Sequence, residues 1–183
     1  MPFPKRYAEL AARLRVPLGF AIGALFLALA RPTWPSLAAG GAIGALGLAL
    51  RAWAAGHLAK NERLATSGPF AHTRNPLYIG TLIVGVGFAI AGAQAGIGIL
   101  LVLFFVFLYL PVVEEEQRHL RKLFPEYAAY ESQAPKFWPR FSAFGLSRES
   151  FSPALYTKNK EYQALAAFLL VMGLLAAKAW FRL

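Results

Sequence analysis

Residues 77–113 form a stretch of 37 residues without a single Lys, Arg, Asp or Glu. A helix needs roughly 20 mostly apolar residues to cross the hydrocarbon core of a bilayer. The stretch is long enough for two crossings, and its centre, "GAQAG" at residues 92–96, is where a hairpin between them would fall. The chain is therefore predicted to be an all-α membrane protein.

Three further stretches, residues 16–30, 36–50 and 162–177, also lack charged side chains. Hydrophobic residues make up 57% of the chain and charged residues 15%, with a mean hydropathy of +0.47, whereas soluble domains contain about 25% charged residues. Tryptophan and arginine at the span ends can lie at the membrane interface. We expect five membrane-spanning helices, at about residues 14–33, 36–57, 77–93, 96–113 and 162–181.

The distribution of basic residues predicts the orientation of these helices. Of the 19 Lys and Arg residues, 16 fall in residues 1–15, 51–76 and 114–161, which all lie on one side of a five-helix topology. Cytoplasmic segments carry such an excess. We therefore expect a multi-pass protein with its N-terminus in the cytoplasm, its C-terminus outside, and any active site facing the cytoplasm.

The same topology accounts for the net charge of +10, because basic flanks are attracted to anionic membrane lipids. No nucleic-acid partner is predicted. The chain has no Cys and only three scattered His residues, so no metal site is expected. Glycines within the spans, in "GFAIG" (residues 19–23), "GGAIGALG" (40–47) and "GVGFAIAG" (85–92), are expected to permit close helix packing.

The first polar segment, residues 57–80, contains "SGPFAHTRNPLYIG". Ser67 to Pro69 are typical of a turn, and Asn75 followed by Pro76 is typical of a capped helix start. Arg74 precedes the cap, at the end of the helix that attracts anions. The segment therefore fits either a plain connector or one wall of a site for a carboxylate or phosphate.

The second polar segment, residues 114–140, begins with Glu114, Glu115 and Glu116 directly after an apolar span. Either the helix continues beyond the membrane or these carboxylates have cationic or hydroxyl partners. A Glu114–Arg118 pair at i,i+4 favours continuation. The role of residues 141–161 is left unassigned, and Asn159 and Glu161 are expected to flank the last span rather than line the pocket.

Together, "LATSGPFAHTRNPLYIG" and "EEEQRHLRKLFPEYAAYESQAPKFWPR" resemble the isoprenylcysteine carboxyl methyltransferase family, small integral membrane methyltransferases related to phospholipid N-methyltransferases. The resemblance covers about residues 47–140. It implies a single domain over residues 1–183, with the helix at 162–181 additional to the core. It also implies S-adenosyl-L-methionine as cofactor, S-adenosylhomocysteine as product, and a lipophilic or lipidated acceptor that reaches the cytoplasmic pocket from the bilayer.

The resemblance also implies the site residues. Arg74 and Glu116 are the expected catalytic residues. The expected cofactor contacts are Lys60, Arg63, Leu64, Ala65, Phe70, Arg74, Asn75, Pro76, Leu77, Tyr78, Glu115 and Glu116.

Two departures leave the acceptor open among a carboxylate, a thiol and an amine. Asn75 stands where the isoprenylcysteine enzymes have His, and residues 108–113, "LYLPVV", lack the basic residues that precede the glutamates in the eukaryotic enzymes.

Two alternative functions also remain. Membrane sterol and steroid reductases, which use NADPH, share a similar arginine–His–Pro–x–Tyr region, and a non-catalytic membrane scaffold would need only loops and interface helices.

Overall fold

The computed structural model describes residues 3–143 and 149–181, and the regular structure within these ranges is helical. Part of the unassigned segment 141–161 thus lies outside the described residues. The elements are α1 (Lys5–Leu29), α2 (Trp34–Ala55), η1 (Gly68–Ala71), α3 (Pro76–Ala91), α4 (Ala95–Phe104), η2 (Phe105–Tyr109), α5 (Leu110–Leu123), α6 (Tyr127–Gln133), α7 (Pro153–Lys158) and α8 (Tyr162–Phe181).

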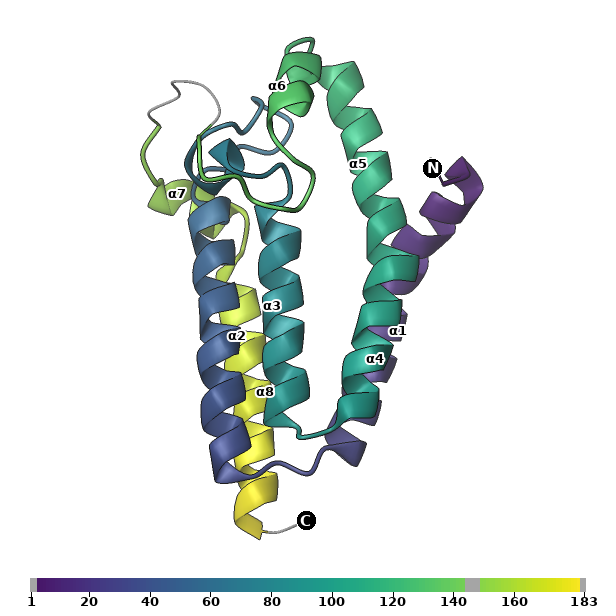
Figure 1. The fold of residues 1–183 in the computed structure, drawn as a ribbon, viewed down its shortest axis with the longest axis vertical. Coiled ribbons are helices and arrows are strands. Elements are labelled where there is room, and N and C mark those ends of the chain that lie inside the picture. The colour runs from purple at the N-terminus through teal and green to yellow at the C-terminus, as the bar shows by residue number, and fades with distance from the viewer. Residues whose placement is uncertain (1–2, 144–148, 182–183) are drawn as a thin grey trace.

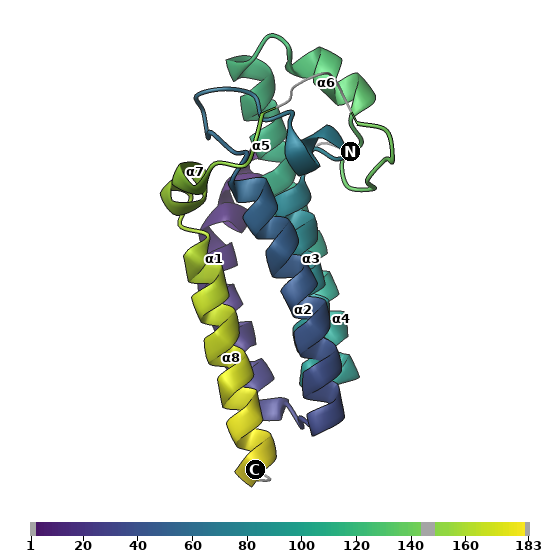
Figure 2. The same cartoon turned by 90° about the vertical axis from the view of Figure 1, so that its left-hand side faces the viewer.

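The long helices run side by side in an elongated bundle (Figure 1). α2 and α3 form its most extensive contact, α1 packs along the α4–α5 helix, and α8 packs against α2. Figure 2 shows α8 and α2 as neighbours in the view turned by 90°. The short helices η1, α6 and α7 gather at one end of the bundle, and the C-terminal end of α8 lies at the other. Both polar segments therefore lie at the same end.

Four helical segments are long and apolar enough to cross a membrane: Arg6–Leu29, Trp34–Ala55, Ala95–Leu123 and Tyr162–Phe181. The fifth expected span, α3, has 16 residues, or about 24 Å at 1.5 Å per residue, which is short of the ~30 Å hydrocarbon core. The protein is a multi-pass membrane protein by these criteria. The bounds of α8 agree with the prediction, whereas α1 begins about nine residues earlier because its basic first turns are helical too.

The helix of the fourth expected span continues beyond residue 113 as α5 to Leu123, as the Glu–Arg spacing favoured. Pro111 has no N–H for the Phe107 carbonyl four residues earlier. A π-helical turn, η2, precedes this point, with the Leu110 N–H donating to the Phe105 carbonyl. The Tyr7 hydroxyl of α1 donates to the Phe107 carbonyl at 2.7 Å. A bond from α1 thus replaces the missing one, as an apolar environment requires.

The glycines of α2 and α3 allow the two helices to touch through their backbones. A Cβ placed on Gly87 would lie 2.6 Å from Gly44 N and 2.7 Å from the Gly40 carbonyl oxygen. The packing role is confirmed for these residues. It is wrong for Gly23 of α1, where an added Cβ would meet nothing within 4 Å.

α8 is attached to α2 and α3 by polar side chains. Glu161 accepts from Arg51 Nε at 2.5 Å and from Nη2 at 3.0 Å, and Arg51 Nη1 also donates to Thr81 Oγ1 at 2.5 Å. Asn159 Nδ2 donates to the carbonyls of Ala55 and Leu58, at 2.9 and 2.8 Å. Asn159 and Glu161 therefore do more than flank the last span: they bind it to the end of α2.

Candidate active site

Hydrogen bonds join the two polar segments where residues 72–75 meet residues 135–140. The Arg74 N–H donates to the Pro135 carbonyl at 2.9 Å, and the Arg140 N–H donates to the His72 carbonyl at 3.0 Å. Thr73 is buried, and its hydroxyl lies 3.3 Å from the Lys136 carbonyl. Residues 72–75 and 135–140 therefore form one polar surface, although they are separated by about sixty residues of chain.

Asn75 contributes to this junction in an unexpected way. Helix α3 begins at Pro76, as predicted, but the Asn75 side chain makes no capping hydrogen bond to it. Instead, the buried Asn75 donates from Nδ2 to the Lys136 carbonyl at 2.8 Å. The predicted capping role of Asn75 is wrong, because its side-chain amide bonds to the second polar segment and not to the start of α3.

Tyr78 and Glu116 connect α3 to α5. The Tyr78 hydroxyl donates to Glu116 Oε2 at 2.9 Å. The Tyr78 ring meets Tyr109 edge-on at 5.9 Å, Tyr109 stacks on Phe105 at 5.7 Å, and Phe105 meets Phe137 at 6.1 Å. These four rings form an aromatic row from α3 across η2 to the second polar segment, beside the exposed carboxylate of Glu116.

The other two glutamates have cationic partners. Glu115 Oε2 accepts from Arg118 at 2.8 Å, three residues away, and Glu114 pairs with Lys136. The predicted Glu114–Arg118 pair is therefore wrong: Arg118 reaches back by one turn to Glu115, while Glu114 pairs with Lys136 near the end of the same polar segment. Both proposed explanations of the glutamate cluster hold, since α5 continues past it and each carboxylate has a partner.

Arg74 is held in an ion-pair network. It pairs with Glu131, which also accepts from Arg121 at 2.7 Å through both carboxylate oxygens. The hydrogen bonds from Arg121 are the largest influence on Glu131, and with the Arg74 charge they lower its pKa to about 2. Glu131 is therefore ionised at neutral pH and fixes the Arg74 guanidinium at the edge of the joined segments.

Three buried polar atoms within the described ranges have no hydrogen-bond partner in the protein: Arg74 Nε, Tyr127 Oη and Gln117 Nε2. The Tyr127 hydroxyl lies close enough to Arg74 for the two to interact electrostatically, and burial raises the pKa of Tyr127, so this hydroxyl keeps its proton. Buried polar groups in folded proteins normally have partners. The Arg74 guanidinium therefore retains donor capacity beyond its ion pair with Glu131.

The remaining predicted cofactor contacts occupy several environments. Leu64 packs against the buried cluster of Phe124, Tyr127 and Tyr130, and Ala65, Phe70 and Leu77 pack around Ala54. Pro76 is fully buried. Phe70 is 7% exposed, and its carbonyl accepts from Tyr130 Oη at 2.7 Å. Lys60 is exposed, and Arg63 pairs with Glu149 at 2.5 Å.

Sequence reasoning missed two features near these residues. Arg15 of α1, which is half-buried, lies within electrostatic range of the Tyr78 hydroxyl, so a cation from α1 approaches the site. His57 is buried and its Nδ1 lies 2.9 Å from Ser67 Oγ. The His57 ring fills the space where a Cβ on Gly68 would lie, and Gly68 has a φ of +56°, so this turn requires glycine. No local pattern indicated either contact.

The comparison with protein families identifies the region that contains this site. Residues 44–127 match the model described as phospholipid methyltransferase. The chain is similar to that family over this segment. The segment includes α3, the first polar segment and the glutamates of α5, and it confirms the resemblance to small membrane methyltransferases. α1, α7 and α8 lie outside it.

Two curated proteins are similar to the chain. A cobalt-zinc-cadmium resistance protein, CzcN, of Cupriavidus metallidurans is 34% identical over 108 residues, covering 56% of this chain and 50% of that protein. A nickel-cobalt-cadmium resistance protein, NccN, of Alcaligenes xylosoxydans xylosoxydans is 33% identical over 108 residues, covering 56% and 51%. The chain spans about half the length of these relatives. No solved structure matches it significantly.

The names of these relatives concern metal resistance, which makes the metal-ligating side chains of this chain relevant. Residues 3–143 and 149–181 contain no group of three or more His, Cys, Asp or Glu side chains that could hold a metal ion.

Proposed function

We propose that the protein transfers a methyl group from S-adenosyl-L-methionine to a lipophilic acceptor, at a site on the cytoplasmic side of the membrane. The observation that carries the proposal is the junction of the two polar segments, where the Tyr78–Glu116 hydrogen bond and Arg74 lie at one end of the bundle. The family match over residues 44–127 supports the reaction class. The excess of basic residues at this end supports the cytoplasmic orientation.

The residues of this junction suit the groups of that cofactor. Arg74 has a donor, Nε, that no described protein atom uses, and it suits the carboxylate. Glu116 is exposed and has acceptor capacity beyond its bond from Tyr78, so it suits the amino group or the ribose hydroxyls. The rings of Tyr78 and Tyr109 suit the adenine or the sulfonium cation, a contact worth about 0.5–2 kcal/mol.

When bound, S-adenosyl-L-methionine supplies an activated methyl group that an acceptor atom takes by in-line displacement. The protein's contribution is alignment and exclusion of water. Tyr78 fixes the Glu116 carboxylate, and the Glu131 network fixes Arg74. The aromatic row of Tyr78, Tyr109, Phe105 and Phe137 supplies an apolar wall along which a lipophilic acceptor fits.

Methylation of lipid extracts tests the proposal. The purified protein in nanodiscs is incubated with a radiolabelled methyl donor and total lipid extract, and the lipid phase is counted and separated. We expect labelled lipid with the wild type and a loss of at least tenfold with Glu116→Ala. The matched control is Glu126→Ala, since Glu126 is an exposed residue just before α6. No labelled product from extracts that contain carboxylate, thiol and amine acceptors would overturn the proposal.

A further inference from the structure

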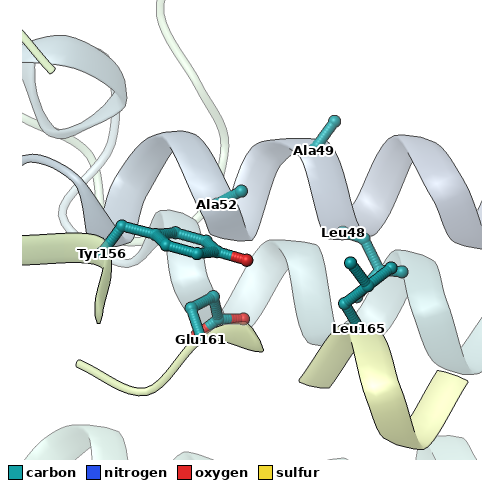
Figure 3. Close-up of a pocket in the computed structure, with 6 residues that line it drawn as sticks. All are labelled: Leu48, Ala49, Ala52, Tyr156, Glu161 and Leu165. Carbon is teal, nitrogen blue, oxygen red and sulfur yellow. The ribbon is translucent and has the colours of Figure 1, made fainter. Parts of the chain in front are cut away.

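A hollow lies on the α8 side of α2, away from the Tyr78–Glu116 pair. It has a volume of about 190 Å³ and is lined by Leu48, Ala49 and Ala52 of α2, Tyr156 of α7, and Glu161 and Leu165 at the start of α8. Figure 3 shows the two polar side chains at one end of the hollow and the leucines at the other. Three of the lining residues lie beyond residue 127, outside the family match, so the hollow is not part of the matched core.

The polar end of the hollow has unused hydrogen-bonding capacity. The Tyr156 hydroxyl points toward the space beside the Glu161 carboxylate (Figure 3), and it has no hydrogen-bond partner among the described residues. Glu161 is 8% exposed, and each of its oxygens accepts one hydrogen bond from Arg51. A carboxylate oxygen can accept two. The hollow therefore offers free acceptor sites and one hydroxyl.

The position of the hollow indicates where an occupant would come from. Its walls belong to α2 and α8, two helices long and apolar enough to cross the membrane. Ala49 is exposed and Leu165 is 44% exposed, so the hollow opens sideways, toward lipid. Ala52 stands near the end of α2, and Glu161 directly precedes α8, both at the end of the bundle that carries the polar segments. A molecule lying in the adjacent leaflet would thus meet the polar end with its head and the leucines with its chain.

We propose that this hollow binds a single-chain membrane amphiphile whose head donates hydrogen bonds, a hydroxyl or an ammonium group. The head donates to Glu161 and meets the Tyr156 hydroxyl, and the chain runs along Leu48 and Leu165. The Glu161 carboxylate needs a hydrogen-bond donor, which an anionic head does not offer. Because Arg51 already balances the charge of Glu161, the head needs no positive charge of its own, and a neutral hydroxyl suffices. The volume is below the roughly 300–1,000 Å³ of sites that enclose drug-sized ligands. It therefore takes a head and the beginning of one chain.

Photolabelling tests the proposal directly. The wild-type protein in nanodiscs is irradiated with a diazirine-bearing long-chain alcohol, the corresponding amine, and the corresponding carboxylate, and labelled peptides are mapped by mass spectrometry. We expect the alcohol and the amine to label α2 and α8 at the hollow at least about fivefold more than the carboxylate. Equal labelling by the three heads, or labelling elsewhere only, would overturn the proposal.

Matched variants locate the site. Ala49→Trp fills the hollow and should reduce labelling at least fivefold, whereas Ala45→Trp, one turn away on the exposed side of α2, should leave it unchanged. Tyr156→Phe keeps the ring and should reduce labelling by the alcohol about 2- to 10-fold, the range expected for one hydrogen bond. Equal effects of the two tryptophans would contradict the assignment. The assay needs no methyl donor, so its failure leaves the proposed methyl transfer intact.

Discussion

Substituting Gly87 by Ala tests the close packing that positions α3. The added Cβ would lie 2.6, 2.7 and 2.8 Å from Gly44 N, the Gly40 carbonyl oxygen and Gly44 Cα. Ordinary heavy-atom contacts are about 3.5–4.0 Å. All three atoms belong to the α2 backbone, so no side chain can rotate away and the helices must separate. Overpacking of this kind costs about 1–3 kcal/mol, only partly offset by the ~1 kcal/mol that alanine gains over glycine in a helix.

Gly23→Ala is the control, because nothing lies within 4 Å of its added Cβ and only the helix-propensity gain applies. The propensity gain is common to both variants and cancels, so we expect them to differ by the overpacking cost of about 1–3 kcal/mol, which corresponds to about 2–12 °C in Tm for a chain of this size. Thermal unfolding in nanodiscs, followed by circular dichroism, measures the difference. Equal melting temperatures for the two variants would refute the backbone contact between α2 and α3.

Three further predictions concern polar contacts. Glu161→Ala leaves the half-buried Arg51 without its carboxylate partner and should lower the free energy of unfolding by about 3–5 kcal/mol. The control Glu62→Ala removes an exposed ion pair and should cost at most about 1 kcal/mol. Equal losses in the two variants would contradict a stabilising role of the Arg51–Glu161 pair. Tyr130→Phe removes the hydrogen bond to the buried Phe70 carbonyl and should destabilise the protein by about 1–3 kcal/mol, with exposed Tyr162→Phe unchanged. Because the pKa of Glu131 is lowered to about 2, the ionised Glu131 stabilises the folded protein fully above pH 4.5, and this contribution is lost as the pH falls toward 2. Glu131→Gln should therefore lose less stability than the wild type over that interval. Parallel pH profiles of stability for the two proteins would contradict the ion pairs of Glu131.

Local sequence patterns were sufficient for the features that depend on neighbouring residues. The bounds of α8 follow from the apolar stretch itself, and the start of α3 follows from Pro76. The small residues of α2 and α3 indicated a close helix contact, which the structure has at Gly87.

Contacts between distant segments could not be read in the same way. Arg74 pairs with Glu131, and Arg51 pairs with Glu161, 110 residues away. Which carboxylate an arginine reaches depends on how α6 and α8 pack, and no spacing rule gives that. Asn75 shows the same effect, because its side chain bonds to the carbonyl of Lys136, far away in the sequence, and not to the start of α3 as expected. Hydropathy likewise overestimated the end of the first span and did not reveal the helical first turns of α1.

Calorimetric binding of S-adenosylhomocysteine tests the central claim most directly. We expect the wild-type protein to bind it and Glu116→Gln, which keeps the size of the side chain, to bind at least tenfold more weakly, while Glu126→Gln binds like the wild type. NADPH titrated into the same preparation should give no saturable signal. Binding of NADPH in place of S-adenosylhomocysteine, or equal affinity of the two glutamine variants, would contradict a cofactor site at the junction of the two polar segments.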